Sequence, residues 1–196
     1  LPEGTFQRDG IRIRRFPVNA GRDVETFQRL QEAICRGQTL APEEEEAWLR
    51  NSVNADGLVA HLEQNAEAID RVVAGPYLFG LVEAVARALP EKTLLAPCLH
   101  DEPFARVGRI RDMFQRVRGF LFNTEPERRL AHRLFGLHPQ TDAVVAMGIE
   151  PFTVGPQAFA KRTGITGDYV IYSGRREPLK GTPLLVAQRG ALALAL

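Results

Sequence analysis

Two cations near the end of the chain lie in a pattern that suits the binding of phosphate. Arg175 and Lys180 follow residues 169–173, whose run of Tyr, Val and Ile favours a buried strand. Thr182 and Pro183 then predict the first turn of a helix, because Thr is a good N-cap and Pro suits the first helical position. A helix N-terminus beside two fixed positive charges would attract a phosphate group.

Three consecutive ionisable residues, His100, Asp101 and Glu102, follow another apolar stretch at residues 93–98. In open α/β sheets, ligands bind beyond the carboxyl ends of the strands, so a loop at this point is well placed for chemistry. His100 could donate a hydrogen bond to a ligand hydroxyl or accept one from it. The alternative is structural, since Asp101 and Glu102 could cap a helix that begins at Pro103.

Apolar stretches recur at intervals of 22 to 26 residues, which predicts alternating strands and helices. This alternation is typical of βαβ units and a parallel sheet. We therefore predict an α/β fold, a Rossmann-like parallel sheet with helices on both faces. Strands are expected at residues 71–74, 93–98, 119–122 and 143–146, and helices at 77–89, 104–118 and 124–136.

The N-terminal third of the chain predicts one strand and three helices. Apolar and basic residues alternate at 11–16, and helices are expected from Asp23, Pro42 and Leu58, the last running to residue 68. The four glutamates at 43–46 could form a functional acidic cluster. The preferred interpretation is that their charges favour a helix N-terminus on a solvated face.

Basic and imidazole side chains elsewhere have structural interpretations as well. The expected helix 104–118 carries five arginines opposite its apolar residues. That face could bind an anionic acceptor or lipid headgroups, and a solvated helix face is the preferred interpretation. We interpret His61 as a packing or surface residue, and His132 and His138 as surface residues.

The composition is that of an ordinary globular protein. The chain has 196 residues, 44% hydrophobic and 25% charged, with a net charge of +1, so it gives no reason to expect nucleic-acid binding. Neither a signal peptide nor an apolar stretch of about 18 residues is apparent. Cys35 and Cys98 lack metal-ligand spacing, which predicts reduced, buried thiols in a cytoplasmic protein.

Four segments, in order along the chain, resemble parts of the group 1 (family four) glycosyltransferases of GT-B type. The segments are Leu-His-Asp-Glu-Pro at 99–103, Phe-Asn-Thr-Glu-Pro-Glu at 122–127, Val-Ala-Met-Gly-Ile-Glu-Pro at 145–151, and Tyr-Val-Ile-Tyr-Ser-Gly-Arg at 169–175 with Lys-Gly at 180–181. The first three are similar to the later part of the family's first domain, and the fourth is similar to the start of its second domain.

The resemblance implies a division of the chain into three parts. Residues 1–155 would be part of the N-terminal, acceptor-side domain, 156–167 an interdomain linker, and 168–196 the beginning of the nucleotide-sugar-binding domain. The family's early Gly-rich loop and its later paired-glutamate motif have no counterpart in these residues. We therefore expect this polypeptide alone to be inactive.

The implied activity is that of a retaining glycosyltransferase. It would transfer a sugar from a nucleotide-sugar donor to a glycan or lipid-linked acceptor, in the synthesis of cell-envelope polysaccharides. The family's histidine faces the donor sugar, and that role is carried to His100 alone. The candidate site residues are His100 and Asp101 for catalysis, Gly174, Arg175 and Lys180 for the donor diphosphate, and Glu102 and Gly148 lining the cleft.

The candidate site needs no cofactor in this interpretation. Fixed cations would neutralise the charge that builds on a departing nucleoside diphosphate, so a metal-independent enzyme is expected. Arg176 could replace Arg175 if the loop is shifted by one residue, and Gly148 could equally be a plain turn glycine. The expected location is the cytoplasm, with a peripheral contact to the inner face of the cell membrane as an alternative.

A non-catalytic α/β domain that binds a small anion or a partner protein is the alternative. The apolar residues 191–196 would then be a partner-binding element. A nicotinamide dehydrogenase is disfavoured, because no Gly-x-Gly-x-x-Gly follows any expected strand.

Overall fold

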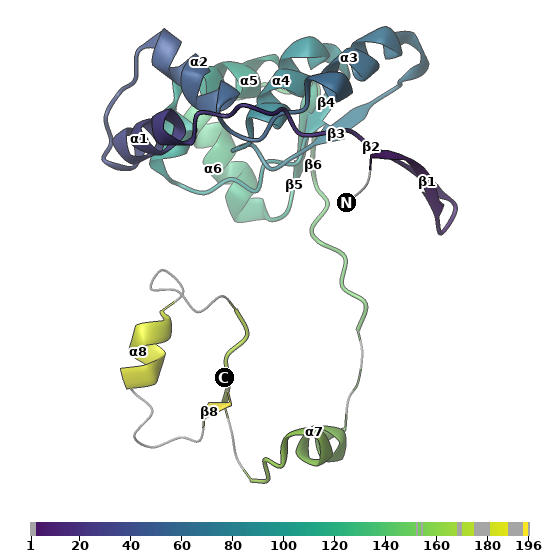
Figure 1. Ribbon diagram of the computed structural model, residues 1–196, viewed down its shortest axis with the longest axis vertical. Helices are drawn as coiled ribbons and strands as arrows, with labels where there is room; N and C mark the ends of the chain where they lie inside the picture. Colours follow the sequence, from purple (N-terminus) through teal and green to yellow (C-terminus); the bar gives the residue numbers. More distant parts are fainter. Residues whose placement is uncertain are drawn as a thin grey trace. The chain divides into compact units, whose positions relative to one another are not determined.

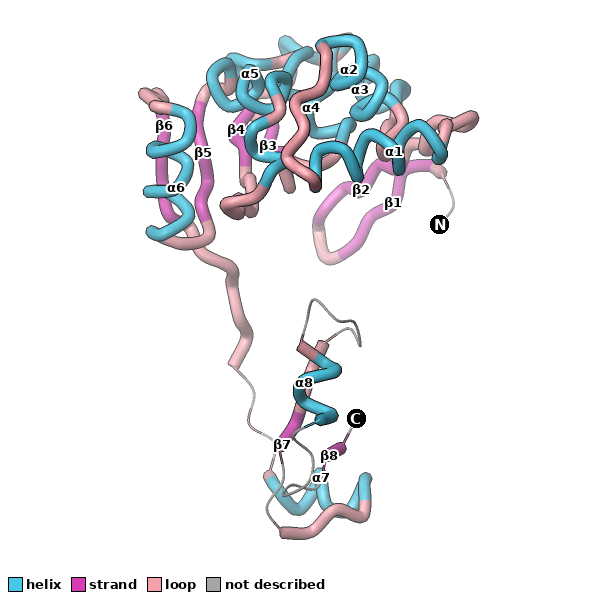
Figure 2. Tube along the Cα trace, turned by 90° about the vertical axis from the view of Figure 1, so that its left-hand side faces the viewer, coloured by secondary structure: helices cyan, strands magenta, loops and turns pink. Residues whose placement is uncertain are grey.

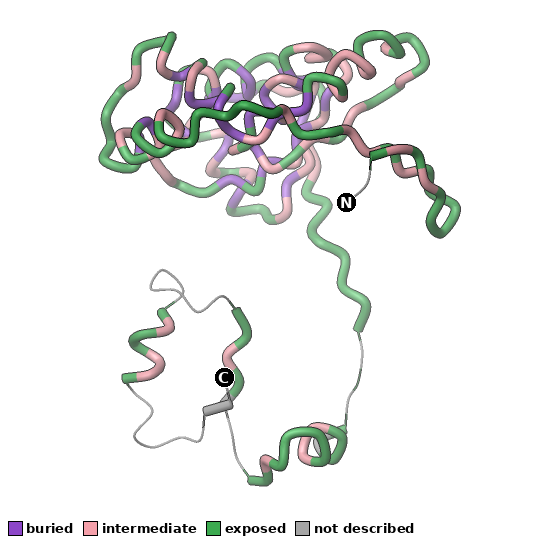
Figure 3. Tube along the Cα trace, in the orientation of Figure 1, coloured by how far each residue is buried: buried purple, intermediate pink, exposed green. Residues whose placement is uncertain are grey.

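The chain divides into two compact units, Leu1–Gly148 and Ile149–Leu196 (Figure 1). The computed structural model describes residues 3–151, 153, 155–167, 170–174, 181–187 and 194–195. Buried residues are found in the first unit, where helices and a sheet pack together (Figure 3). The functional roles assigned to the parts of the chain stay predictions.

A four-stranded parallel sheet is the centre of the first unit. Its strands are β3 (Val72–Ala74), β4 (Thr93–Leu95), β5 (Gly119–Phe122) and β6 (Thr141–Val144), side by side in the order β3-β4-β5-β6 (Figure 2). Because the strands are parallel, their carboxyl ends lie at one edge of the sheet. Helices flank this sheet, which confirms the predicted α/β, Rossmann-like fold.

The helices follow the predicted order, and the strand expected at 11–16 pairs with a strand that was not predicted. An antiparallel hairpin of β1 (Gly4–Arg8) and β2 (Ile11–Arg15) comes first, turning at Asp9 and Gly10. The helices are α1 (Val24–Cys35), α2 (Pro42–Arg50), α3 (Asp56–Gln64), α4 (Gly80–Ala88), α5 (Gly108–Arg116) and α6 (Glu125–Phe135), with short 3-10 turns η1 (Ala66–Ala68), η2 (Pro90–Lys92) and η3 (Pro103–Arg106).

Aromatic stacking holds α5 and α6 against one face of the sheet. Phe120 and Phe122 lie two residues apart on β5, so both side chains point to that face, where they are buried. Phe114 of α5 stacks on Phe120 at 5.5 Å between ring centroids and on Phe135 of α6 at 4.2 Å. On β3, by contrast, Val73 exposes 61% of its surface.

Two expected helices have different bounds in the structure, because tertiary contacts override the helical period. The expected helix 104–118 is divided at Val107, whose ψ of 134° is extended. The carboxylate of Glu45 accepts from the backbone N–H groups of Gly108 and Arg109, so a new helix begins there. The expected helix 77–89 begins only at Gly80, since the backbone N–H of Tyr77 donates to Pro97.

Three smaller expectations also need correction. The helix expected to run to residue 68 ends at Gln64 and continues only as the turn η1. The last strand of the sheet is shifted two residues toward the N-terminus, to Thr141–Val144. Cys35 and Cys98 are exposed rather than buried, because the first ends α1 and the second lies in the loop beyond β4.

The second unit has short elements. Helix α7 (Pro156–Thr163) lies in the segment expected to be a linker, and it ends at Gly164, whose φ of 75° is left-handed. Strand β7 (Val170–Ile171) pairs in parallel with β8 (Leu194–Ala195), and α8 (Thr182–Ala187) begins at the expected residue. Ile171 exposes 56% of its surface, so this strand is not buried as expected.

Candidate functional site

The candidate site lies at the edge of the four-stranded sheet where its strands end. His100, Asp101 and Glu102 follow β4 there, and Gly148 follows β6. Among the described residues, three besides glycine have a positive φ, and two of them lie just beyond these strands. They are Cys98 (52°) and Ala146 (57°). Left-handed backbone at such residues is strained, and strain of this kind clusters at functional sites.

Asp101 is held by two arginines. Its carboxylate accepts from Arg106 at 2.6 Å and lies 3.8 Å from Arg133 of α6. Its side chain is half-exposed, so these pairs orient it without removing it from water. Neither Asp101 nor Glu102 caps η3 through its side chain, so the capping alternative is wrong.

Glu102 is positioned by a buried tyrosine. The hydroxyl of Tyr77 donates to its Oε1 at 2.7 Å, and Tyr77 is fully buried. The backbone N–H of Tyr77 also donates to the carbonyl oxygen of Pro97. Tyr77 therefore joins the loop after β3 to the loop after β4. Sequence reasoning missed this role because it placed Tyr77 inside a helix.

Burial of Tyr77, with the hydrogen bond to Glu102 second, raises the pKa of its phenol well above the ordinary value. An unfolded tyrosine ionises near pH 10, so above that pH only the unfolded state releases this proton. We expect this contribution to stability to be constant below pH 10 and to fall above it by up to about 1.4 kcal/mol per pH unit. Urea unfolding of Tyr77→Phe between pH 8 and 11 should show a shallower alkaline loss than the unmodified protein. An identical slope in both would contradict this assignment.

His100 is the candidate whose side chain is free to bind a ligand. It is exposed and has no hydrogen-bond or ionic partner within the described ranges. Gly148 is also exposed, and a Cβ added to it would meet no atom within 4 Å. Its φ is not left-handed, so neither conformation nor space requires glycine there.

Glu127 ties together the loops after β4 and β5. It is buried at 8% exposure, and its two carboxylate oxygens accept from the backbone N–H groups of Leu99 and Asn123, each at 2.7 Å. The expected capping box is half confirmed, because Thr124 accepts from the backbone N–H of Glu127. In a full capping box the carboxylate of Glu127 would accept from the backbone N–H of Thr124, but here it accepts from that of Asn123. Leu99 is next to His100, so Glu127 fixes the backbone that carries the candidate histidine.

The helix N-termini that follow these strands already have acceptors from the chain itself. For α4, Ser52 Oγ accepts from Gly80 at 2.6 Å. At the start of α5, Glu45 accepts from the backbone N–H groups of Gly108 and Arg109. At the start of α6, Thr124 accepts from the backbone N–H of Glu127. Free N–H groups at helix N-termini are what bind phosphate in many α/β proteins. At each of these three helices at least one such N–H group already has an acceptor from the chain, which disfavours an anion site at α4, α5 or α6.

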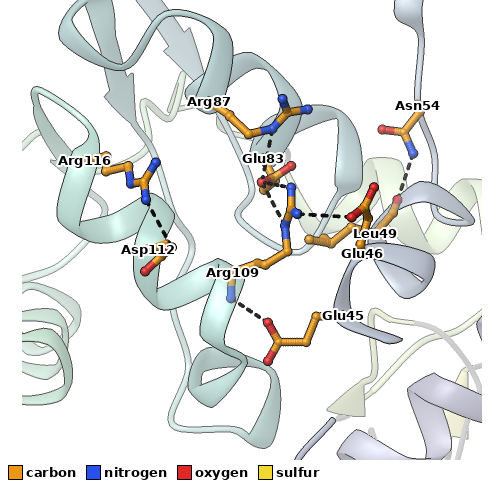
Figure 4. A network of polar contacts seen from close by, with 9 residues as sticks. All are labelled: Glu45, Glu46, Leu49, Asn54, Glu83, Arg87, Arg109, Asp112 and Arg116. Carbon is orange, nitrogen blue, oxygen red and sulfur yellow. Dashed lines mark hydrogen bonds and ion pairs between the residues drawn. The ribbon is translucent and has the colours of Figure 1, made fainter. Parts of the chain in front are cut away.

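Carboxylates pair with two of the three arginines of α5, Arg109 and Arg116 (Figure 4). Arg109 donates to Glu83 at 2.8 Å and lies 3.8 Å from Glu46, and Arg87 lies 3.6 Å from Glu83. Arg116 pairs with Asp112 at 3.3 Å. With Arg106 paired to Asp101, three of the five arginines have carboxylate partners, so they do not form a free basic row. The interpretation of the glutamates as wholly solvated is also wrong, because Glu45 is buried across from α5.

The other histidines divide between packing and surface roles. His61 packs near the ring of Phe16 and contacts Asn65 at 2.9 Å, in agreement with a packing role. His132 is half-buried and contacts Asp142 of β6 at 2.5 Å, where Arg128 also pairs with that carboxylate at 3.0 Å. Asp142 raises the pKa of the Arg128 guanidinium. His132 thus joins α6 to the sheet, so its interpretation as a surface residue is wrong, whereas His138 is exposed as expected.

The candidate diphosphate-binding residues belong to the second unit. Gly174 is described and exposed, whereas Arg175, Arg176 and Lys180 lie outside the described residues. The part of the chain that is described contains no group of three His, Cys, Asp or Glu residues placed to hold a metal ion. In that same part, no helix has the length and apolar character needed to cross a bilayer.

Comparison with known proteins finds similarity to a glycosyltransferase. The chain is 32% identical over 109 residues to a D-inositol 3-phosphate glycosyltransferase of Jonesia denitrificans, in a match covering 51% of this chain and 25% of that protein. The match therefore spans about a quarter of the length of this relative. No family model matches the chain, and no solved structure matches it. The similarity supports a relationship to glycosyltransferases in general.

Proposed function

We propose that this chain is part of a retaining glycosyltransferase that uses a nucleotide-sugar donor and transfers the sugar to a glycan or lipid-linked acceptor. The observation that carries the proposal is the similarity to a glycosyltransferase over half of the chain. The parallel sheet supports it, because its carboxyl edge presents an exposed, unpartnered imidazole at His100 within the described part of the chain.

Each candidate residue has a chemical role in this proposal. His100 would hydrogen-bond a hydroxyl of the donor sugar, and Asp101, already oriented by Arg106, would border the same space. Glu102 is fixed by Tyr77 and would line the cleft. Departure of a nucleoside diphosphate builds negative charge on its phosphate oxygens, which fixed cations stabilise without a metal ion.

The cations that would take this role are Arg175 and Lys180, with Gly174 allowing close approach of the phosphate. The acceptor-side role of residues 1–155 and the donor-side role of residues 168–196 belong to the same proposal. The occupied helix N-termini of the first unit favour this division, because they leave the diphosphate to be bound elsewhere.

Replacement of Lys180 by alanine should weaken nucleoside diphosphate binding in the full-length protein by at least about tenfold, since one charge-assisted phosphate contact is lost. Isothermal titration calorimetry against a panel of nucleoside diphosphates would measure this and would also identify the base. Lys161→Ala is the matched control, because Lys161 is an exposed lysine of α7 in the same unit.

Unchanged affinity in Lys180→Ala would remove the main support for donor binding by this loop. Absence of binding to every nucleoside diphosphate would instead favour the alternative of a non-catalytic α/β domain with a protein partner. Binding that Lys161→Ala weakens as much as Lys180→Ala would indicate general electrostatic attraction and would count against a specific site.

A further inference from the structure

An apolar pocket of about 350 Å³ lies in the first unit, bordered by α1, α2, η3 and the loop after β3. Its apolar lining residues are Phe27, Trp48, Val53, Pro76, Leu78, Phe79 and Phe104. The rings of Trp48 and Phe104 stack almost parallel, with centroids 5.8 Å apart. Phe79 exposes 43% of its surface, which is unusual for so large an apolar side chain.

The polar residues that line the pocket are all engaged within the chain. Arg22 Nε donates to the carbonyl oxygen of Asn51 at 2.9 Å. Gln31 accepts from the indole N–H of Trp48 at 2.9 Å, and Ser52 accepts from Gly80. Each of these three polar residues makes at least one hydrogen bond within the chain, and the Arg22 guanidinium also lies over the ring of Phe27, 5.8 Å from its centroid. The pocket therefore offers a ligand mainly apolar contact.

Lining residues of the pocket are close in sequence to residues of the candidate site, and Tyr77 contacts that site. Phe104 follows Glu102 by two residues, and Tyr77 lies between the lining residues Pro76 and Leu78. The hydroxyl of Tyr77 donates to Glu102 at 2.7 Å. Tyr77 therefore lies between the lining of this pocket and the loop that carries His100.

The size and chemistry of the pocket select the class of ligand. An apolar cavity of about 150 Å³ accommodates a benzene ring, so this pocket can hold a longer alkyl chain or a larger aryl group. The N–H group at the start of α4 already donates to Ser52, and Arg22 is the single cation of the described lining, so the pocket favours an apolar group over a phosphate.

We infer that this pocket binds the apolar alkyl or aryl group of the acceptor, and that the acceptor is a small amphiphile rather than a free sugar phosphate. That the bound molecule is the acceptor rests on the proposed function, whereas the binding of an apolar group does not. Trp48 offers a direct readout, because it is the single tryptophan of the 196 residues and lines the pocket.

The test is a titration of the Trp48 fluorescence in the full-length protein with methyl, hexyl and octyl β-glucosides below their micelle concentrations. Trp48→Phe identifies the part of the signal that comes from this residue. We expect a saturable change with the octyl and hexyl compounds and none with the methyl compound. Each added methylene should tighten binding by about threefold to fourfold.

Two variants probe the pocket itself. Phe79→Ala removes one wall and should weaken octyl glucoside binding by about tenfold, whereas Val53→Phe should weaken it by filling the space. Ile11→Ala is the matched control, because Ile11 is 66% exposed on the N-terminal hairpin. Both pocket variants alter exposed or half-exposed side chains, so they test binding without removing the core.

Several results would overturn the inference. These are an equal response to methyl and octyl glucosides, unchanged affinity in both pocket variants, or displacement of octyl glucoside by inorganic phosphate. Self-association that Phe79→Ala abolishes would instead assign the pocket to a second copy of the chain. If octyl glucoside changes the fluorescence but no nucleoside diphosphate binds, the proposed function is rejected and the binding of an apolar group to the pocket stands. If a nucleoside diphosphate binds but octyl glucoside gives no response, only the inference about the pocket is rejected.

Discussion

Glu127→Gln is expected to lower the free energy of unfolding by about 3 kcal/mol. The buried carboxylate accepts from the backbone N–H groups of Leu99 and Asn123, and each such bond to a charged acceptor contributes about 1.5 to 3 kcal/mol. Glutamine keeps one acceptor oxygen but turns its NH₂ group toward the other N–H, which is then left buried and unpaired. Urea unfolding followed by the fluorescence of Trp48 measures the change.

The matched control for this prediction is Glu125→Gln on the same helix. Glu125 is 48% exposed and pairs only loosely with Arg128 and Arg129, at 3.5 and 3.6 Å. Such surface pairs contribute about 0 to 1 kcal/mol. Equal losses in the two variants would show that the position of Glu127 between two strand-end loops has no special energetic importance.

Glu45→Gln should destabilise the protein by about 2 to 3 kcal/mol, for a related reason. Its two carboxylate oxygens accept from the backbone N–H groups of Gly108 and Arg109, each at 2.8 Å, and so provide the cap of α5 from a different helix. A Cβ at Gly108 would lie only 3.0 Å from this carboxylate. The close approach thus depends on glycine as well as on the acid.

Glu43→Gln in the same helix is the control for Glu45, because Glu43 is exposed. A loss below about 0.5 kcal/mol is expected there, as for most surface substitutions. Circular dichroism in the far ultraviolet during urea titration would report both. A stable Glu45→Gln variant would mean that water replaces the carboxylate at the start of α5.

Local patterns in the sequence were enough to predict most of the fold. The spacing of apolar stretches predicted four parallel strands, because each βα unit needs a strand and a helix of limited length. Capping residues predicted two helix starts, since the side chains of Asp23 and Thr124 accept from backbone N–H groups three residues later. Gly136 ends α6 with a left-handed φ of 60°, as its sequence position predicted.

The partners of the buried polar groups depended on the tertiary structure. Glu45 caps a helix that begins 63 residues later, Glu127 reaches back 28 residues to Leu99, and Tyr77 bonds to Glu102, 25 residues away. No periodicity in the sequence encodes such a choice, because several acceptors of equal chemistry stand within a few residues of each one that is used. The sequence by itself determined which segments become strands and helices and which loop carries the candidate histidine. Packing decided which carboxylates are buried as caps and which aromatic side chains enclose the pocket, because burial leaves each N–H only the acceptor that the fold places beside it.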